Sequence, residues 1–248
     1  MWGNLFVPLF MQNKLKTIES FFSSVSFVEK SHTYYVENKK LSTSVSGVVK
    51  SFVEEVDFVN IAKSIDKRDS LKEGVTKRLW DLKAESSCAL GNRVHFFGEV
   101  YTFNKSILPN NKYEDAVVAF WKSLPKHIVP VFTELEMYHI ENMFGGTADI
   151  ILYNTQTEKF IIADYKTNEN LFKCFKNKML KGIFKDLLEN SFNKYQIQFS
   201  LYQILFEQSG FEVERRLLVW LRPNGEFEMY DTEDYTHRLK VYLENNSI

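Results

Sequence analysis

Asp164 and Lys166 stand at the polar end of an apolar run, where their spacing allows them to act together. The run from Phe160 to Ala163 predicts a buried β-strand. Residues two apart on a strand project from one face, so Asp164 and Lys166 point together while Tyr165 points to the other. Two charges at the end of a buried strand cost free energy unless they pair or bind an ion. The triplet alone therefore leaves open both a structural ion pair and a metal-binding site.

Further carboxylates precede this strand along the chain. Asp149 follows Gly145-Gly146, which predicts a tight turn into a neighbouring strand. Glu134 and Glu136 lie on one face of the strand before that turn. A hard dication such as Mg²⁺ or Mn²⁺ takes several oxygen ligands, and carboxylates from adjacent strands supply them. The pattern therefore indicates a metal centre built on two or three strands.

Such a centre would support hydrolysis of a phosphodiester. One or two bound dications polarise the phosphate, activate water and stabilise the leaving oxygen. Lys166 would orient or deprotonate the attacking water and offset the phosphate charge. We therefore expect Asp149, Asp164 and Lys166 to form the catalytic core, with Glu134 as a further candidate.

The elements that must position these residues change character between Pro125 and Pro130. Aromatic and β-branched residues at 32–36, followed by a polar turn at 37–40, predict a β-hairpin. Beyond Pro130 a period of two predicts strands, and the nearly continuous apolar run at 160–165 is typical of a central one. The expected helices span 44–52, 58–65, 75–84, 86–101, 113–124, 193–208 and the C-terminal residues, and the expected strands span 131–139, 147–153, 160–165, 215–221 and 226–230.

This order of elements predicts an α/β fold with a mixed central β-sheet flanked by helices and a helical N-terminal part. A single domain over residues 1–248 is expected, with the hairpin and helical part at about 1–125 and the catalytic α/β core at 126–248. The apolar opening at residues 1–11 lacks the features of a signal peptide and is expected to be a strand or a docking segment of the fold.

Four motifs, which follow one another along the chain in the family's order, resemble the RecB-like branch of the PD-(D/E)XK nuclease superfamily. The core of that superfamily is restriction-endonuclease-like. The catalytic strands are matched by Gly146-Thr147-Ala148-Asp149 and Asp164-Tyr165-Lys166-Thr167. Gly91-x-x-x-His95 resembles the histidine helix of that branch, and Gln198-x-x-x-Tyr202 resembles its glutamine–tyrosine helix. The segment from His32 to Val49 is similar to the N-terminal part of phage-encoded exonucleases. The resemblance covers roughly residues 31 to 221.

The resemblance implies roles for individual residues. Asp149, Asp164, His95 and the backbone carbonyl of Tyr165 would bind the metal, together with a strand glutamate. Glu134 fits the spacing to Gly146 slightly better, but Glu136 shares its face, so either could be that ligand. Gln198, Tyr202 and Thr167 would contact the substrate.

The chain departs from the family pattern at two points. The proline of the nominal motif is absent, since Ala148 precedes Asp149, as is common in this branch. Relatives with an iron–sulfur cluster carry four cysteines, whereas this chain has only Cys88 and Cys174, so no cluster is expected.

A stretch rich in lysine and phenylalanine follows the active-site strand directly. Its lysines could follow a phosphate backbone while its aromatic rings stack on bases, or they could be the solvated face of an amphipathic helix. The position beside the active-site strand favours contact with DNA. The lysines predicted to contact DNA are Lys173, Lys176, Lys178 and Lys181.

The overall charge gives no support to a general attraction for nucleic acid. The formal net charge is −1, so binding to DNA would depend on a local basic surface. No stretch reaches membrane-spanning length and the cysteines form no secreted framework, so a soluble, cytoplasmic protein is expected, with a phage-infected host cell as the setting that the resemblance implies.

Taken with the resemblance, these features predict a Mg²⁺- or Mn²⁺-dependent deoxyribonuclease. An exonuclease acting on DNA ends or single strands, in phage or mobile-element replication, recombination or repair, is the favoured form. A restriction- or repair-type endonuclease with the same core is the first alternative. A catalytically silent nucleic-acid-binding protein is the second, and the intact Asp149, Asp164 and Lys166 argue against it.

Overall fold

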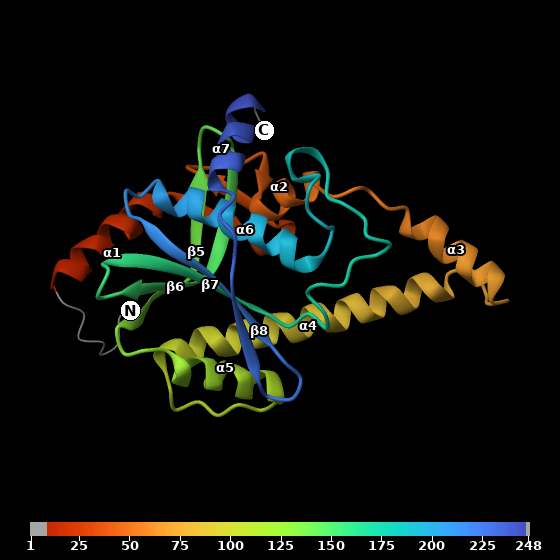
Figure 1. Ribbon diagram of the computed structural model, residues 1–248, viewed down its shortest axis with the longest axis horizontal. Coiled ribbons are helices and arrows are strands. Elements are labelled where there is room, and N and C mark those ends of the chain that lie inside the picture. The colour runs from red at the N-terminus through yellow and green to blue at the C-terminus, as the bar shows by residue number, and fades with distance from the viewer. Residues whose placement is uncertain (1–8, 247–248) are drawn as a thin grey trace.

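A mixed β-sheet flanked by helices forms the centre of the computed structural model, which describes residues 9–246 (Figure 1). Six strands make up this sheet, and its main path runs β4 (Thr43–Ser44), β6 (Phe144–Asn154), β7 (Lys159–Lys166), β8 (Val213–Leu221) and β9 (Phe227–Asp231). β5 (Ile128–His139) pairs with β6 outside this path. The predicted α/β class with a mixed sheet flanked by helices is confirmed, and β7 lies centrally as expected.

Strand directions explain why the sheet is mixed. β6 runs antiparallel to both β5 and β7, whereas β7 and β8 are parallel and are joined through α6 (Ser191–Glu207). β4 pairs in parallel with the first residues of β6, at Phe144 and Gly145. β6 therefore meets β4 near its beginning and β7 near its end.

The two faces of the sheet bury separate hydrophobic clusters. Phe160 and Ile162 of β7 pack with α1 (Leu9–Phe22), α2 (Val45–Ser51), α6 and α7 (Thr236–Asn245). Ile161, Ala163 and Tyr165 pack with α4 (Val75–Phe103) and α5 (Lys112–Ser123) on the opposite face. This alternation is what a central strand covered on both sides requires.

A small antiparallel sheet lies beside the main one. The predicted hairpin is formed by β2 (Thr33–Val36) and β3 (Lys39–Lys40), and β1 (Val25–Val28) adds a third strand. α3 (Phe58–Arg68) packs along the first part of α4, and the two helices extend away from the sheet (Figure 1).

The turn expected at Gly145-Gly146 is elsewhere. Residues 140–143 make the turn, and both glycines lie inside β6. A Cβ atom at Gly146 would stand 2.6 Å from Cγ2 of Val45 and 2.9 Å from Cε1 of Tyr202. Glycine here serves the close approach of α2 and α6 to the strand, which is the other common use of glycine in strands.

One further expectation about elements is wrong, and for the opening segment the strand alternative is excluded at residues 9–11. The helices expected at 75–84 and 86–101 are one helix, α4, of 29 residues. The polar stretch between them contains neither glycine nor proline, so nothing there stops a helix. Residues 9–11 begin α1 and are not a strand, while residues 1–8 of the opening segment lie outside the described residues. Among residues 9–246 no helix is both long enough and apolar enough to span a bilayer.

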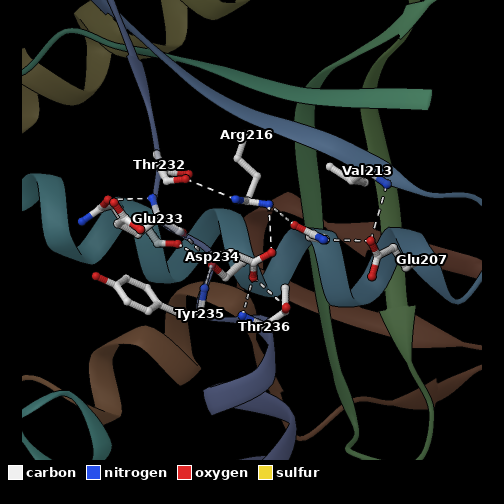
Figure 2. A network of polar contacts seen from close by, with 11 residues as sticks. Glu207, Val213, Arg216, Thr232, Glu233, Asp234, Tyr235 and Thr236 are labelled. Carbon is white, nitrogen blue, oxygen red and sulfur yellow. Dashed lines mark hydrogen bonds and ion pairs between the residues drawn. The ribbon is translucent and has the colours of Figure 1, made fainter. Parts of the chain in front are cut away.

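A buried polar network fixes how α6 is turned about its axis (Figure 2). Arg216 of β8 donates to the side-chain oxygen of Gln203 on α6 and, over 3.2 Å, to the carbonyl of Thr232. The hydroxyl oxygen of Ser200 accepts the backbone N–H of Tyr235 over 3.0 Å. With this face held by the chain before α7, the face of α6 that carries Tyr202 is directed toward β6.

Close contact between α4 and β7 depends on Gly98. A Cβ atom there would stand 2.5 Å from Cε2 of the buried Tyr165 ring, a distance that side chains cannot tolerate without a shift. Gly91 lies on the same helix two turns earlier, and a Cβ atom there would meet only Oγ1 of Thr167, at 3.9 Å. The two glycines therefore form a matched pair, one packed and one open.

We expect Gly98→Ala to destabilise the protein although alanine favours a helix. The gain in helix propensity is about 1 kcal/mol, whereas overpacking against a buried ring costs about 1–3 kcal/mol. Gly91→Ala, which meets no such contact, should stabilise by about 0.5–1 kcal/mol. Urea unfolding followed by circular dichroism measures both, and a Gly98→Ala variant as stable as Gly91→Ala would show that α4 does not pack as described.

Candidate metal centre

The candidate site lies where β6 and β7 separate. Pairing between these strands ends at Ile150 and Ala163. Asp149 precedes Ile150 on β6, and Asp164 follows Ala163 on β7, so these two aspartates come directly after the last pair. From Asp164 onward, β7 pairs only with β8. Two aspartates from neighbouring strands therefore face an opening in the sheet.

Asp164 is buried and forms an ion pair with Lys166, its neighbour on the same face of β7. The Lys166 amine also lies 4.6 Å from the centre of the Tyr195 ring on α6. This arrangement agrees with the strand alternation that placed both side chains on one face. An ion pair of this kind could be purely structural. The groups around it therefore decide between a structural ion pair and a metal-binding site.

His95 of α4 joins the two strands. Its Nδ1 atom lies 2.7 Å from Oδ2 of Asp149, and its Nε2 atom lies 3.0 Å from the backbone carbonyl oxygen of Tyr165. Both contacts are made by residues that the sequence assigned to metal binding. Packing of Gly98 on the Tyr165 ring sets the depth at which His95 reaches them.

Glu134 of β5 completes a cluster of possible ligands. His95, Glu134 and Asp149 each offer a ligand atom within 4.8 Å of the others, and they are the group found among the described residues. Glu134 has a left-handed backbone, with φ of 50°, which non-glycine residues seldom adopt outside special sites. Glu136 lies on the same strand opposite Thr147 and does not belong to this cluster.

Burial and mutual repulsion set the proton affinities of the acids. Burial raises the pKa of Asp164 well above its ordinary value, and the charge of Asp149 raises it further. Burial also raises the pKa of Asp149, but the positive charges of His95 and Lys166 outweigh this and hold it well below its ordinary value. Burial and Asp149 raise the pKa of Glu134 to about 7.

The basic groups respond in the opposite sense. Burial lowers the pKa of His95, but the Asp149 carboxylate outweighs it and the net pKa rises to about 9. Burial likewise lowers the pKa of Lys166, and the charges of Asp164 and Asp149 raise it above its ordinary value. Asp164, Glu134 and His95 therefore hold protons more tightly than usual, because negative charges crowd together here, whereas Asp149 stays ionised.

The donor set fits a hard dication. Oδ1 of Asp164 is buried and accepts no hydrogen bond from the described residues, whereas Oδ2 of Asp149 has His95 Nδ1 as its close partner. Buried carboxylate oxygens without a hydrogen bond are costly, and a bound cation would satisfy them. Three carboxylates and an imidazole suit Mg²⁺ or Mn²⁺, with Asp149, Asp164, Glu134 and His95 as the residues that would hold it.

The predicted substrate residues lie around this centre. On α6, Nε2 of Gln198 donates to the hydroxyl of Tyr202 over 3.1 Å, and Oε1 of Gln198 is buried with no hydrogen bond from the described residues. Thr167 directly follows Lys166 at the end of β7 and faces Gly91. The structure therefore brings Gln198, Tyr202 and Thr167 to the edge of the opening.

The lysine-rich stretch after β7 is neither a helix nor uniformly solvated. Residues 167–190 form an irregular loop with one short 3₁₀ turn at Gly182–Phe184. Lys178 lies 3.2 Å from Glu189 and 3.3 Å from Glu54, so it holds the loop against the chain after α2. Lys173, Lys176 and Lys181 are exposed, which leaves them free to meet a phosphate backbone. The amphipathic-helix alternative is wrong.

Two neighbours of the site had no assigned role in the sequence. Tyr34 of β2 is buried, and its hydroxyl lies 2.9 Å from Oγ1 of Thr147 on β6. Tyr195 lies beneath the Lys166 amine. Both belong to segments that resemble the nuclease family, and only this resemblance could have pointed to them from the sequence.

Comparison with known proteins does not assign this chain to a family. No family model matches the sequence, and no curated protein matches it. A solved structure described as "Crystal structure of SSO0001" is similar over 97% of this chain and 86% of that chain, with 15% sequence identity and a TM-score of 0.37. A likeness this low carries no argument about fold or function.

We expect the stability of the metal-free protein to fall as pH rises from about 5 to about 9. Glu134 and His95 have raised pKa values and therefore bind protons more tightly in the folded state, and linkage then requires stability to decrease through this range. A cation must displace these protons, so stabilisation by Mg²⁺ should grow with pH. Thermal unfolding in EDTA and in Mg²⁺ measures both trends.

The control for this experiment is His95→Gln. This variant should lose the decline between about pH 6.5 and 9, because the group whose pKa lies there is gone. Stabilisation by Mg²⁺ that is equal at all pH values in the wild-type protein would show that the cation binds elsewhere.

Proposed function

We propose that this protein is a Mg²⁺- or Mn²⁺-dependent deoxyribonuclease with a restriction-endonuclease-like PD-(D/E)XK core. The observation that carries the proposal is the approach of two carboxylates, the half-buried Asp149 and the buried Asp164, beside His95 and Lys166 where two strands separate, with Oδ1 of Asp164 left without a hydrogen bond from the described residues. A protein that only bound nucleic acid would gain nothing from crowding these charges, since a metal-free pair repels both itself and phosphate.

A bound dication would supply Lewis-acid polarisation of the phosphodiester and a nucleophile at neutral pH. The protein's own groups would do the remaining work. Lys166 would hold its charge near the phosphate while Asp164 and the Tyr195 ring keep its amine in place. His95 would orient Asp149 through their contact. Gln198 and Tyr202 would border the strand to be cut.

An exonuclease acting on ends or single strands is the form that we propose, because the resemblance to phage-encoded exonucleases favours it. The setting that we propose is replication, recombination or repair of phage or mobile-element DNA inside a cell. Cleavage of end-labelled linear single strands, linear duplexes and closed circles tests the assignment. An exonuclease requires free ends, and cutting of closed circles would favour the endonuclease alternative.

Asp164→Asn should lower the cleavage rate at least about 100-fold, because it removes a metal-binding charge without changing volume, and such charge stabilisation is worth several kcal/mol. The fold should survive in EDTA with equal or greater stability, since the repulsion from Asp149 is gone. Asp231→Asn, at an exposed aspartate paired with Arg215, is the control and should cut normally. Wild-type cutting by Asp164→Asn would end the proposal.

Replacing Lys173, Lys176 and Lys181 by Gln should weaken DNA binding without changing the saturating single-turnover rate. Each lost phosphate contact should flatten the logarithmic salt dependence of binding by about 0.7–0.9. Gln at Lys16, Lys122 and Lys240, which are exposed on α1, α5 and α7, removes the same charge and is the control. Equal effects of the two triple variants would show that the loop lysines contribute only net charge.

A further inference from the structure

A second concave feature lies beside the metal centre. A cavity of about 280 Å³ is enclosed by the β1–β2 hairpin, the start of α2 and α6. We call it the hairpin pocket. Its main lining residues are Phe27, His32, Tyr34, Ser44, Ser46 and Tyr202.

The hairpin pocket shares a wall with the metal centre. Tyr202 lines the pocket, and its α6 partner Gln198 lies at the edge of the opening in the sheet. Tyr34 lines the pocket, and its hydroxyl contacts Thr147, two residues before Asp149. The Tyr202 ring also lies against Gly146, three residues before Asp149 on β6. A group in the pocket would therefore belong to the same ligand as a phosphate at the metal centre.

The lining suits a flat ring with polar edges. Phe27 and Tyr34 have ring centres 4.6 Å apart, and His32 lies 5.9 Å from Phe27. Ser44 and Ser46 add hydroxyl groups that donate or accept hydrogen bonds. No Asp, Glu, Lys or Arg is among the residues that line this cavity, so it does not select for charge.

The backbone on either side of the cavity is specialised. His32, at the end of the 3₁₀ turn between β1 and β2, has a left-handed conformation, with φ of 47°, and its ring lies 5.9 Å from that of Phe27. On the opposite wall, Gly146 carries no side chain, and a Cβ atom there would press on Val45 and Tyr202. Gly146 therefore lets the Tyr202 ring lie directly against β6, where it forms one wall of the pocket.

We propose that the hairpin pocket binds the unpaired base of the nucleotide next to the scissile phosphate. Aromatic faces, neutral polar edges and a size for one base are the features by which proteins hold a base that has left the helical stack. A base that stays paired and stacked in a duplex could not enter this pocket. The inference rests on the proposed nuclease function and deepens it, because it makes the substrate single-stranded, or frayed, at this nucleotide.

Binding of short single strands tests the proposal without cleavage. Fluorescence anisotropy with Ca²⁺ in place of Mg²⁺ gives the affinity for a labelled tetranucleotide and for four versions that each lack one base. For the wild-type protein, loss of the base at one position should weaken binding about 10-fold, because stacking of that base is lost. Loss at the other positions should matter less.

The variants His32→Ala and Phe27→Leu complete a thermodynamic cycle. In either variant the intact strand should bind about as weakly as the strand that lacks the critical base, and removing that base should then change affinity less than 2-fold. His237→Ala, at an exposed histidine of α7 that does not line the pocket, should behave as wild type. His32 is exposed, so its variant is expected to fold even if Phe27→Leu does not.

The outcomes separate this proposal from the nuclease assignment. Strand binding in which base removal costs the wild type and the His32→Ala variant the same would overturn the pocket proposal and leave the nuclease function intact. Absence of any strand binding by the wild-type protein would overturn the pocket proposal, and cleavage of the end-labelled linear duplexes would then decide the nuclease function separately.

Discussion

The separation of β6 and β7 is the constraint on which the site depends. Up to Ile150 and Ala163 the two strands satisfy each other's backbone groups, and beyond that point they diverge. Asp149 and Asp164 are the first side chains past the divergence, so they lie close together in a largely buried position between the two strands. Charge held in this way must be neutralised by a cation, by protons or by basic side chains.

The surrounding elements hold this unfavourable arrangement in place. Gly98 admits the Tyr165 ring against α4 and so brings His95 to Asp149. Arg216 and its partners lock the opposite side of α6 and thereby direct Tyr202 to β6 (Figure 2). The free energy gained from these contacts offsets the cost of holding the acids close together, as is typical where strain is concentrated at a functional site.

The parts of the fold that could be predicted from sequence are those governed by local periodicity. The alternation around Asp164 and Lys166 placed both on one face of a central strand, and the structure agrees. Gly145 and Gly146 were misassigned to a turn because a sequence does not distinguish a glycine needed for bending from one needed for close packing. Lys178 was grouped with the exposed lysines because its partners, Glu54 and Glu189, come from distant positions. The hairpin pocket depends on three segments that only tertiary structure brings together.

The central claim is that the acids at the strand divergence bind a divalent cation. Anomalous diffraction from crystals soaked in Mn²⁺ tests it directly, because the signal locates the ion without reference to activity. The account predicts a strong peak bordered by Asp149, His95 and Glu134, next to Asp164. The absence of a peak there, with Mn²⁺ bound at another place or nowhere in the crystal, would contradict it.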